Sequence, residues 1–150
     1  REQGPRDTFA DSGRAEVVTS MQTHPNAASA HSDALRMLQQ HPEINVLVAF
    51  NEATAVGAVQ AVQEMGRVDD LWLVAFDSNV QTIDALQSGA VDALIVQNTY
   101  SMGYFGVESA YRLLAGQGSS VEKSNITAVR VITRDNMFAI DKQKALFPFG

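Results

Sequence analysis

The sequence predicts an α/β fold of three layers, in which a parallel sheet lies between two layers of helices. Short apolar runs, each the length of a strand buried on both faces, end on a polar residue: 46–50 on Asn51, 71–76 on Asp77 and 91–96 on Gln97. Each run is followed by a stretch with helical spacing of its apolar residues. Strict alternation of strand and helix is typical of parallel strands joined by right-handed crossovers, with helices on both faces.

The first part of the chain predicts a helix, a strand and a second helix. Residues 1–13 form the first helix, with Phe9 as its clearest apolar anchor. Residues 15–20 are rich in β-formers and predict a strand, and 27–40 predict a helix that ends before Pro42. A strand should precede the first helix of an α/β chain, so we expect the sequence to be a piece of something larger.

The remaining elements follow the same alternation. The pattern predicts strands at 44–50, 71–76, 91–96 and 125–133, and helices at 53–65, 80–88 and 100–115. The helices end at Gly66, Gly89 and Gly116, the residue type that most often closes a helix. Residues 134–150 have no clear period, but their apolar end, 145–149, is expected to pack on the protein.

Composition excludes several classes of function. The chain has 150 residues, enough for one domain with a sizeable core, and a formal net charge of -6. Nucleic acid is not an expected partner, because phosphate binding needs clustered Lys and Arg. There are no cysteines, which excludes disulfides, a thiol nucleophile and a cysteine-based zinc site. No apolar run is long enough to span a bilayer, and no signal peptide is present, so we expect any export signal to have been removed or to lie outside this sequence.

The polar residues at the strand ends are the candidate site. In an open parallel sheet, ligands bind outside the carboxyl ends of the strands, so we expect Asn51, Asp77 and Gln97 to share one rim. Carboxylate and amide side chains match the donors and acceptors of a hydroxylated ligand, and Arg1, at a helix start, is the candidate that completes the ring. The set lacks an activated nucleophile and a paired acid and base, which favours binding over catalysis.

A structural explanation competes with this one. Asn and Asp are favoured at helix N-caps, so Asn51 and Asp77 are also candidates for capping, whereas Gln97 belongs to a poor capping type. The histidines lack metal-ligand spacing and are expected at the surface. The sequence contains no Gly-x-Ser-x-Gly, Gly-x-Gly-x-x-Gly or Walker motif, so neither a hydrolase nucleophile nor a nucleotide is indicated. No cofactor or metal is predicted.

Three stretches, HPEINVLVAFNEATAVGAVQAVQEMG, LWLVAFDSN and IDALQSGAVDALIVQNTYSMGYFGVESAYRLLAGQ, resemble type I periplasmic sugar-binding proteins of the ribose-binding and galactose-binding kind. These are solute receptors of ABC importers, with two Rossmann-like (flavodoxin-like) lobes that close on a sugar. The resemblance covers about residues 1–133. It implies that Asn51, Asp77 and Gln97 are sugar contacts in the C-terminal lobe, and that Arg1, in Arg1-Glu-Gln-Gly4, is the family arginine.

The chain departs from the family pattern in two places. Pro5 stands where the family usually has Phe after the glycine, which weakens the alignment at Arg1. Ribose binders carry an aromatic residue where this chain has Thr23-His24-Pro25-Asn26, so the sugar is not predicted.

The resemblance also implies an organisation into lobes. Residues 1–98 and 125–150 would form the C-terminal lobe, and 99–124 would belong to an N-terminal lobe that the sequence lacks. We expect the helix at 100–115, left without its lobe, to fold back, to swap with a second copy in a homo-oligomer, or to cover another surface. An ABC permease is the implied partner. The implied location is the periplasm or the cell exterior, as a lipoprotein in a Gram-positive organism.

Other functions remain open from the sequence alone. The same fold serves as the effector core of lactose-repressor-type regulators and as the sensing domain of membrane receptors or histidine kinases. Repressor cores usually carry Pro-x-Leu-Thr-Thr after the strand that ends in Asp, whereas this chain reads DALQSG followed by VDALIVQN, which is typical of transport proteins. An enzyme with Asp77 as base is a further alternative, although no partner for proton transfer is evident.

Overall fold

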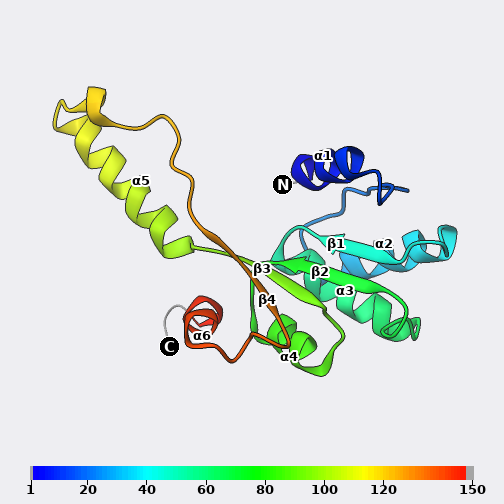
Figure 1. The fold of residues 1–150 in the computed structure, drawn as a ribbon. Helices are drawn as coiled ribbons and strands as arrows, with labels where there is room; N and C mark the ends of the chain where they lie inside the picture. The colour runs from blue at the N-terminus through cyan, green and yellow to red at the C-terminus, as the bar shows by residue number, and fades with distance from the viewer. Residues whose placement is uncertain (1, 148–150) are drawn as a thin grey trace.

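The computed structural model describes residues 2–147 (Figure 1). The strands are β1 (Val46–Ala49), β2 (Trp72–Phe76), β3 (Ala93–Gln97) and β4 (Val129–Thr133). The helices are α1 (Gln3–Ser12), α2 (Ala27–Gln40), α3 (Glu52–Glu64), α4 (Val80–Ser88), α5 (Thr99–Leu114) and α6 (Ile140–Leu146), with a short 3-10 turn, η1 (Gly118–Ser120). Within this part of the chain, no helix is long and apolar enough to cross a membrane.

The sheet has the order β1-β2-β3-β4. The first three strands are parallel, as the alternating pattern predicts, with Ala49 opposite Ala75 and Phe76 opposite Ile95. β4 runs antiparallel to β3 and pairs Val129 with Gln97. The α/β class is therefore confirmed, but the last strand reverses direction because the chain leaves the sheet after β3 and re-enters from the same end.

One face of the sheet carries the core. Alternate residues of the strands are buried there, with Leu73, Leu94 and Ile132 at 0% exposure. α3 contacts β1 and β2, α4 contacts β3, and α2 packs along α3. Met137 and Leu146, in the segment expected to have no period, join the same core, so the apolar tail does pack on the protein as far as it is described.

The other face of the sheet is much more open. Its residues include Val46, Trp72, Val129 and Val131, which are between 46% and 65% exposed. α1 lies on the side of the sheet opposite α3 (Figure 1), but none of its residues is buried. Within residues 2–147, the predicted second helical layer is thus represented by α1 alone.

The strand predicted at 15–20 is absent: these residues form neither a strand nor a helix. A β-strand is stable only when its backbone pairs with a neighbour. β1 is the outermost strand of the sheet, and within the described chain nothing pairs with its free edge. The prediction was wrong because β-forming composition does not supply a pairing partner.

The segment between β3 and β4 projects from the sheet. α5 extends away from the strands in Figure 1, has no buried residue and contacts η1. The segment leaves after Gln97 and returns at Val129, which is paired with Gln97, so both crossings lie at the carboxyl end of β3.

We predict that Gly57→Ala destabilises the protein, because α2 and α3 touch at this residue. A Cβ on Gly57 would lie 2.5 Å from the carbonyl oxygen of Ala27 and 2.5 Å from the amide nitrogen of His31. Such overpacking costs about 1–3 kcal/mol of unfolding free energy, measurable by urea denaturation followed by circular dichroism. Gly106→Ala on α5 is the control, since nothing lies within 4 Å of a Cβ added at this residue. Equal stability of the two variants would contradict the close helix contact.

Candidate functional site

The structure brings the three predicted strand-end residues to the same edge of the sheet. Asn51 and Asp77 each follow the pair Ala49–Ala75 by two residues, and the rings of Phe50 and Phe76, one residue before them, contact each other at 5.5 Å between centroids. Gln97 is the last residue of β3, next to β2. Parallel direction and matched register therefore place the polar residues together, while a role in ligand binding stays a prediction.

Asp77 and Gln97 are in direct contact. Nε2 of Gln97 donates to Oδ1 of Asp77 at 2.5 Å, and both residues are half-buried. The amide N–H of Asp77 donates to the carbonyl of Ile95 at 3.0 Å, which extends the pairing with β3 one residue past the end of β2. A hydrogen bond to a carboxylate is roughly twice as strong as a neutral one, so this contact fixes both side chains.

Asp77 has an unusual backbone. Its φ is 67°, the only positive value at a non-glycine residue in the described chain. Asp tolerates this left-handed conformation better than most residues, and such conformations cluster at functional sites. The turn takes the chain out of β2 towards α4 while the side chain faces β3.

Asn51 has a structural role, as the capping alternative proposed. Its Oδ1 accepts from the amide of Thr54 at 3.0 Å, and the Thr54 hydroxyl accepts from the amide of Asn51 at 3.2 Å. This reciprocal capping box begins α3. Asp77 and Gln97 are not caps, because Asn79 caps α4 and Asn98 caps α5.

Sequence reasoning missed these two caps and a link between helices. Asn79 and Thr82 form a second capping box, and Nδ2 of Asn79 donates to Oε1 of Glu52 at 3.0 Å. The signal was present in the sequence, since an Asn followed three residues later by Thr occurs before both α3 and α4. The Glu52–Asn79 bond joins the first turns of α3 and α4 beside the predicted rim.

The helices α3, α4 and α5 begin two to four residues after the last residues of β1, β2 and β3. The N-terminus of a helix carries a partial positive charge and favours an anion within its first turn. These helix starts therefore lie at the same edge of the sheet as Asp77 and Gln97. Arg1, the other predicted member, lies outside the described residues.

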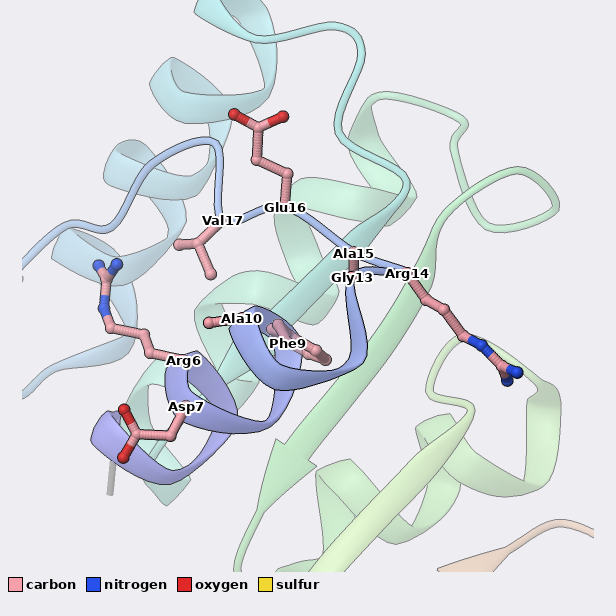
Figure 2. Close-up of a pocket in the computed structure, with 9 residues that line it drawn as sticks. All are labelled: Arg6, Asp7, Phe9, Ala10, Gly13, Arg14, Ala15, Glu16 and Val17. Atoms are coloured by element: carbon pink, nitrogen blue, oxygen red, sulfur yellow. The ribbon is translucent and has the colours of Figure 1, made fainter.

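Two hollows lie away from Asp77 and Gln97. Figure 2 shows the larger, about 640 Å³, between α1 and the segment that follows it; it is lined by Arg6, Asp7, Phe9, Ala10, Gly13, Arg14, Ala15, Glu16 and Val17. The second, about 400 Å³, runs along β1 to Asn51 and is bounded by Glu2, Thr23 and α2. Both are open hollows, and only the second is lined by residues of β1. The hydrogen bond from Arg6 lowers the pKa of Glu2, whose side chain is exposed.

The chemistry of the rim is that of hydrogen bonding. Two amides and a carboxylate donate and accept hydrogen bonds, and the three side chains include no paired acid and base. No group of His, Asp and Glu residues suited to a metal ion occurs among residues 2–147. In the segment where an aromatic residue was sought, His24 is exposed and Asn26 caps α2.

A model of the periplasmic binding protein domain matches residues 1–118. The chain belongs to the periplasmic binding protein family. It is 32% identical over 126 residues to the D-ribose/D-allose-binding protein of Pseudomonas aeruginosa, a match that covers 82% of this chain and 39% of that protein. It is 33% identical over 81 residues to the ribose import binding protein of Escherichia coli, covering 54% of this chain and 27% of that protein.

Solved structures agree with the family. An ABC transporter solute-binding protein from Agrobacterium vitis with bound D-fucose matches with a TM-score of 0.87 and 26% identity, over 97% of this chain and 50% of that chain. Another from the same organism, bound to α-D-tagatopyranose, gives a TM-score of 0.88 and 28% identity, over 97% and 48%. The chain thus spans half or less of the proteins it matches. The resemblance inferred from the sequence and the lobe fold are confirmed, and this family of binding proteins is favoured over the repressor core and the enzyme.

We predict that Asn51→Ala lowers stability even without a ligand, because it leaves the amide of Thr54 without its cap. The expected loss is about 0.5–2 kcal/mol of unfolding free energy. Asn51→Ser is the matched variant: its hydroxyl can still cap the helix, so urea denaturation should show most of the stability retained. An Ala variant as stable as the Ser variant would contradict the capping role.

Proposed function

We propose that this chain is a sugar-gripping lobe of a periplasmic solute receptor that serves an ABC importer. The observation that carries the proposal is the contact of Asp77 with Gln97 at the ends of adjacent strands, with Asn51 following the next strand at the same level. A bound sugar in solved relatives of the same fold supports this reading.

The proposed ligand is a small neutral sugar or polyol. A carboxylate accepts hydrogen bonds from two hydroxyls of one ring, and an amide both donates and accepts. Proteins similar to this chain bind sugars of several kinds: one relative is named for binding ribose and allose, and two similar structures contain fucose or tagatose. Arg1, which lies outside the described residues, is proposed as a further contact.

A second lobe is proposed to complete the grip. Residues 98–128 leave and return at the end of the sheet where Asn51, Asp77 and Gln97 lie. Residues 99–124 are then part of that second lobe, and residues 1–98 and 125–150 form this one. Closure of two lobes on a ligand excludes water and strengthens each polar contact.

The apolar side of α5 supports this division. Five apolar side chains recur at helical spacing and are between 55% and 90% exposed: Tyr100, Tyr104, Val107, Tyr111 and Leu114. A helix with such a stripe normally buries it against another element. We propose that the second lobe is this element, and that a second copy of the chain takes its place when the 150-residue chain is alone.

The transporter permease is the proposed macromolecular partner. The location proposed from the family is the periplasm or the cell exterior, with a lipid anchor at the surface if the organism is Gram-positive. No part of the proposal requires nucleic acid or a cofactor.

Asp77→Asn is expected to weaken sugar binding, because it removes the charge while Asn still tolerates the left-handed backbone. A hydrogen bond to a charged group contributes about 1.5–3 kcal/mol, so affinity should fall by roughly 10- to 150-fold. The measurement is titration calorimetry with ribose, allose, fucose, tagatose and arabinose, on the longest natural polypeptide that contains this sequence.

Asp84→Asn is the control, since Asp84 is exposed on α4 and the change in charge is the same. No heat with any sugar of the panel, or equal affinity of the two variants, would contradict the proposal. The 150-residue chain alone should bind at least tenfold more weakly than the longer polypeptide, because part of the grip is missing.

The isolated 150-residue chain is expected to self-associate through α5. Leu114→Glu places a charge in the stripe at its most exposed position, 90%, and should shift the chain towards monomer. Gln117→Glu adds the same charge beyond the end of α5 and should leave the association unchanged. Analytical ultracentrifugation measures both. A monomeric parent chain, or equal behaviour of the two variants, would contradict association through this stripe.

A further inference from the structure

Residues 17–23 have the burial pattern of a strand but not its pairing. The odd-numbered residues of this segment are half-buried and the even-numbered ones are exposed, which is the period of an extended chain. Within residues 2–147, no backbone group of the segment bonds to another backbone group. Side chains hold it instead: Arg6 donates to Oγ of Ser20 at 2.7 Å, and Arg36 contacts Sδ of Met21 at 3.4 Å.

The hollow of about 400 Å³ lies along the free edge of β1, and we call it the edge hollow. Each of residues 47–51 in turn lines it. Successive side chains of a strand point to opposite faces, so a hollow that meets all of them lies at the edge of the strand. The carbonyl of Asn45 accepts from Trp72 of β2. Because backbone groups alternate between the two edges of a strand, those of Val46 and Val48 are turned to the free edge.

The other walls of the edge hollow suit an apolar strand. Residues 21–23 line it across from β1, so an extended segment lies on each side. Side chains of α2 and α3 also line it: Ala30, Asp33, Ala34, Met37, Thr54 and Ala58. Four of these six are apolar. On the opposite side of the sheet lies α1, which has no buried residue of its own (Figure 1).

The position of Glu2 indicates where such a strand would connect. Glu2 lines the edge hollow together with Phe50 and Asn51, which follow the carboxyl end of β1. A strand parallel to β1 would therefore end beside Glu2 and lead directly into α1, which begins at Gln3. From α1 the chain returns through residues 17–23, which completes the strand–helix–strand connection typical of parallel sheets.

We propose that the edge hollow is a strand-acceptor site, and that its occupant is the stretch of a longer natural polypeptide that immediately precedes residue 1. The strand runs parallel to β1 and bonds both to β1 and to residues 17–23. It is apolar on both faces, because one faces α2 and α3 and the other faces the side of the sheet on which α1 lies. Proteins similar to this chain are longer than it, which is compatible with such a stretch.

The added strand accounts for two features of the fold at once. Residues 17–23 gain the neighbour that a β-forming segment needs, and α1 gains a surface against which Phe9, now only half-buried, can pack. The sheet order becomes residues 17–23, the added strand, β1, β2, β3 and β4. Nothing in this assignment rests on sugar binding.

Amide hydrogen exchange, read by mass spectrometry, tests the site. In the longest natural polypeptide that contains this sequence, residues 17–23 should exchange at least about a hundredfold more slowly than in the 150-residue chain alone, because their backbone groups are then bonded. Residues 27–40 are the internal reference, since α2 makes its own backbone bonds in both. Equal exchange of residues 17–23 in the two proteins overturns the proposal.

Val48→Pro tests the pairing with β1. Proline lacks the N–H that Val48 turns to the free edge, and proline is tolerated at the edge of a sheet but not in its middle. The variant should therefore change the thermal midpoint of the 150-residue chain little, but should abolish the protection of residues 17–23 in the longer polypeptide. Val48→Thr is the control, because it keeps both the N–H and the branched side chain. An equal loss of thermal midpoint in both proteins, or retained protection, overturns the pairing.

Two further outcomes decide the occupant. Protection of residues 17–23 that rises with the concentration of the 150-residue chain would mean that a second copy supplies the strand. A natural polypeptide in which no run of about five apolar residues ends within about six residues of Arg1 would also overturn the assignment, since connections from strand to helix are that short. All measurements are made without sugar, so failure here is distinct from failure of the proposed function.

Discussion

The site depends on the parallel pairing of β1, β2 and β3 in matched register. Parallel strands that stop at the same level bring their last residues to one edge, and the helices that follow begin at that edge too. Polar side chains and helix N-termini therefore coincide without any long-range adjustment. A shift of one residue in the pairing of β2 would turn Leu73 and Ala75 out of the core and separate Asp77 from Gln97.

Much of this arrangement was predictable because it follows from local pattern. The three parallel strands, the helices between them and the shared edge all came from apolar runs that end on a polar residue. The role of Asn51 as a cap was foreseen as an alternative, but the cap of α4 was not: Asp77 ends the strand, and a left-handed turn then places Asn79 at the cap. That turn depends on a backbone conformation that sequence spacing does not encode.

The features that could not be predicted depend on residues distant in the sequence. The segment 15–20 has the composition of a strand yet forms none, since pairing requires a neighbour that the described chain does not place there. The reversed direction of β4 depends on where residues 98–128 return. The link between Glu52 and Asn79 joins two helix starts that are adjacent only after β1 and β2 have paired. The role of Arg1 stays a prediction.

Stability and the proposed recognition of a ligand depend on the same residue in this rim. Asn51 holds α3 with one end of its amide, so its replacement changes the start of a helix as well as any contact with a ligand. Asp77 and Gln97 do not cap a helix, because the N-caps of α4 and α5 are Asn79 and Asn98. Variation at Asp77 and Gln97 is therefore expected to have a smaller effect on the helices than variation at Asn51, and under the proposed function it would alter which ligand is accepted. In the proposed receptor, the adjustable part of the ligand site is the carboxyl end of β2 and β3. Residues 98–128 leave and rejoin the sheet at that same end, where the proposed second lobe would close over it.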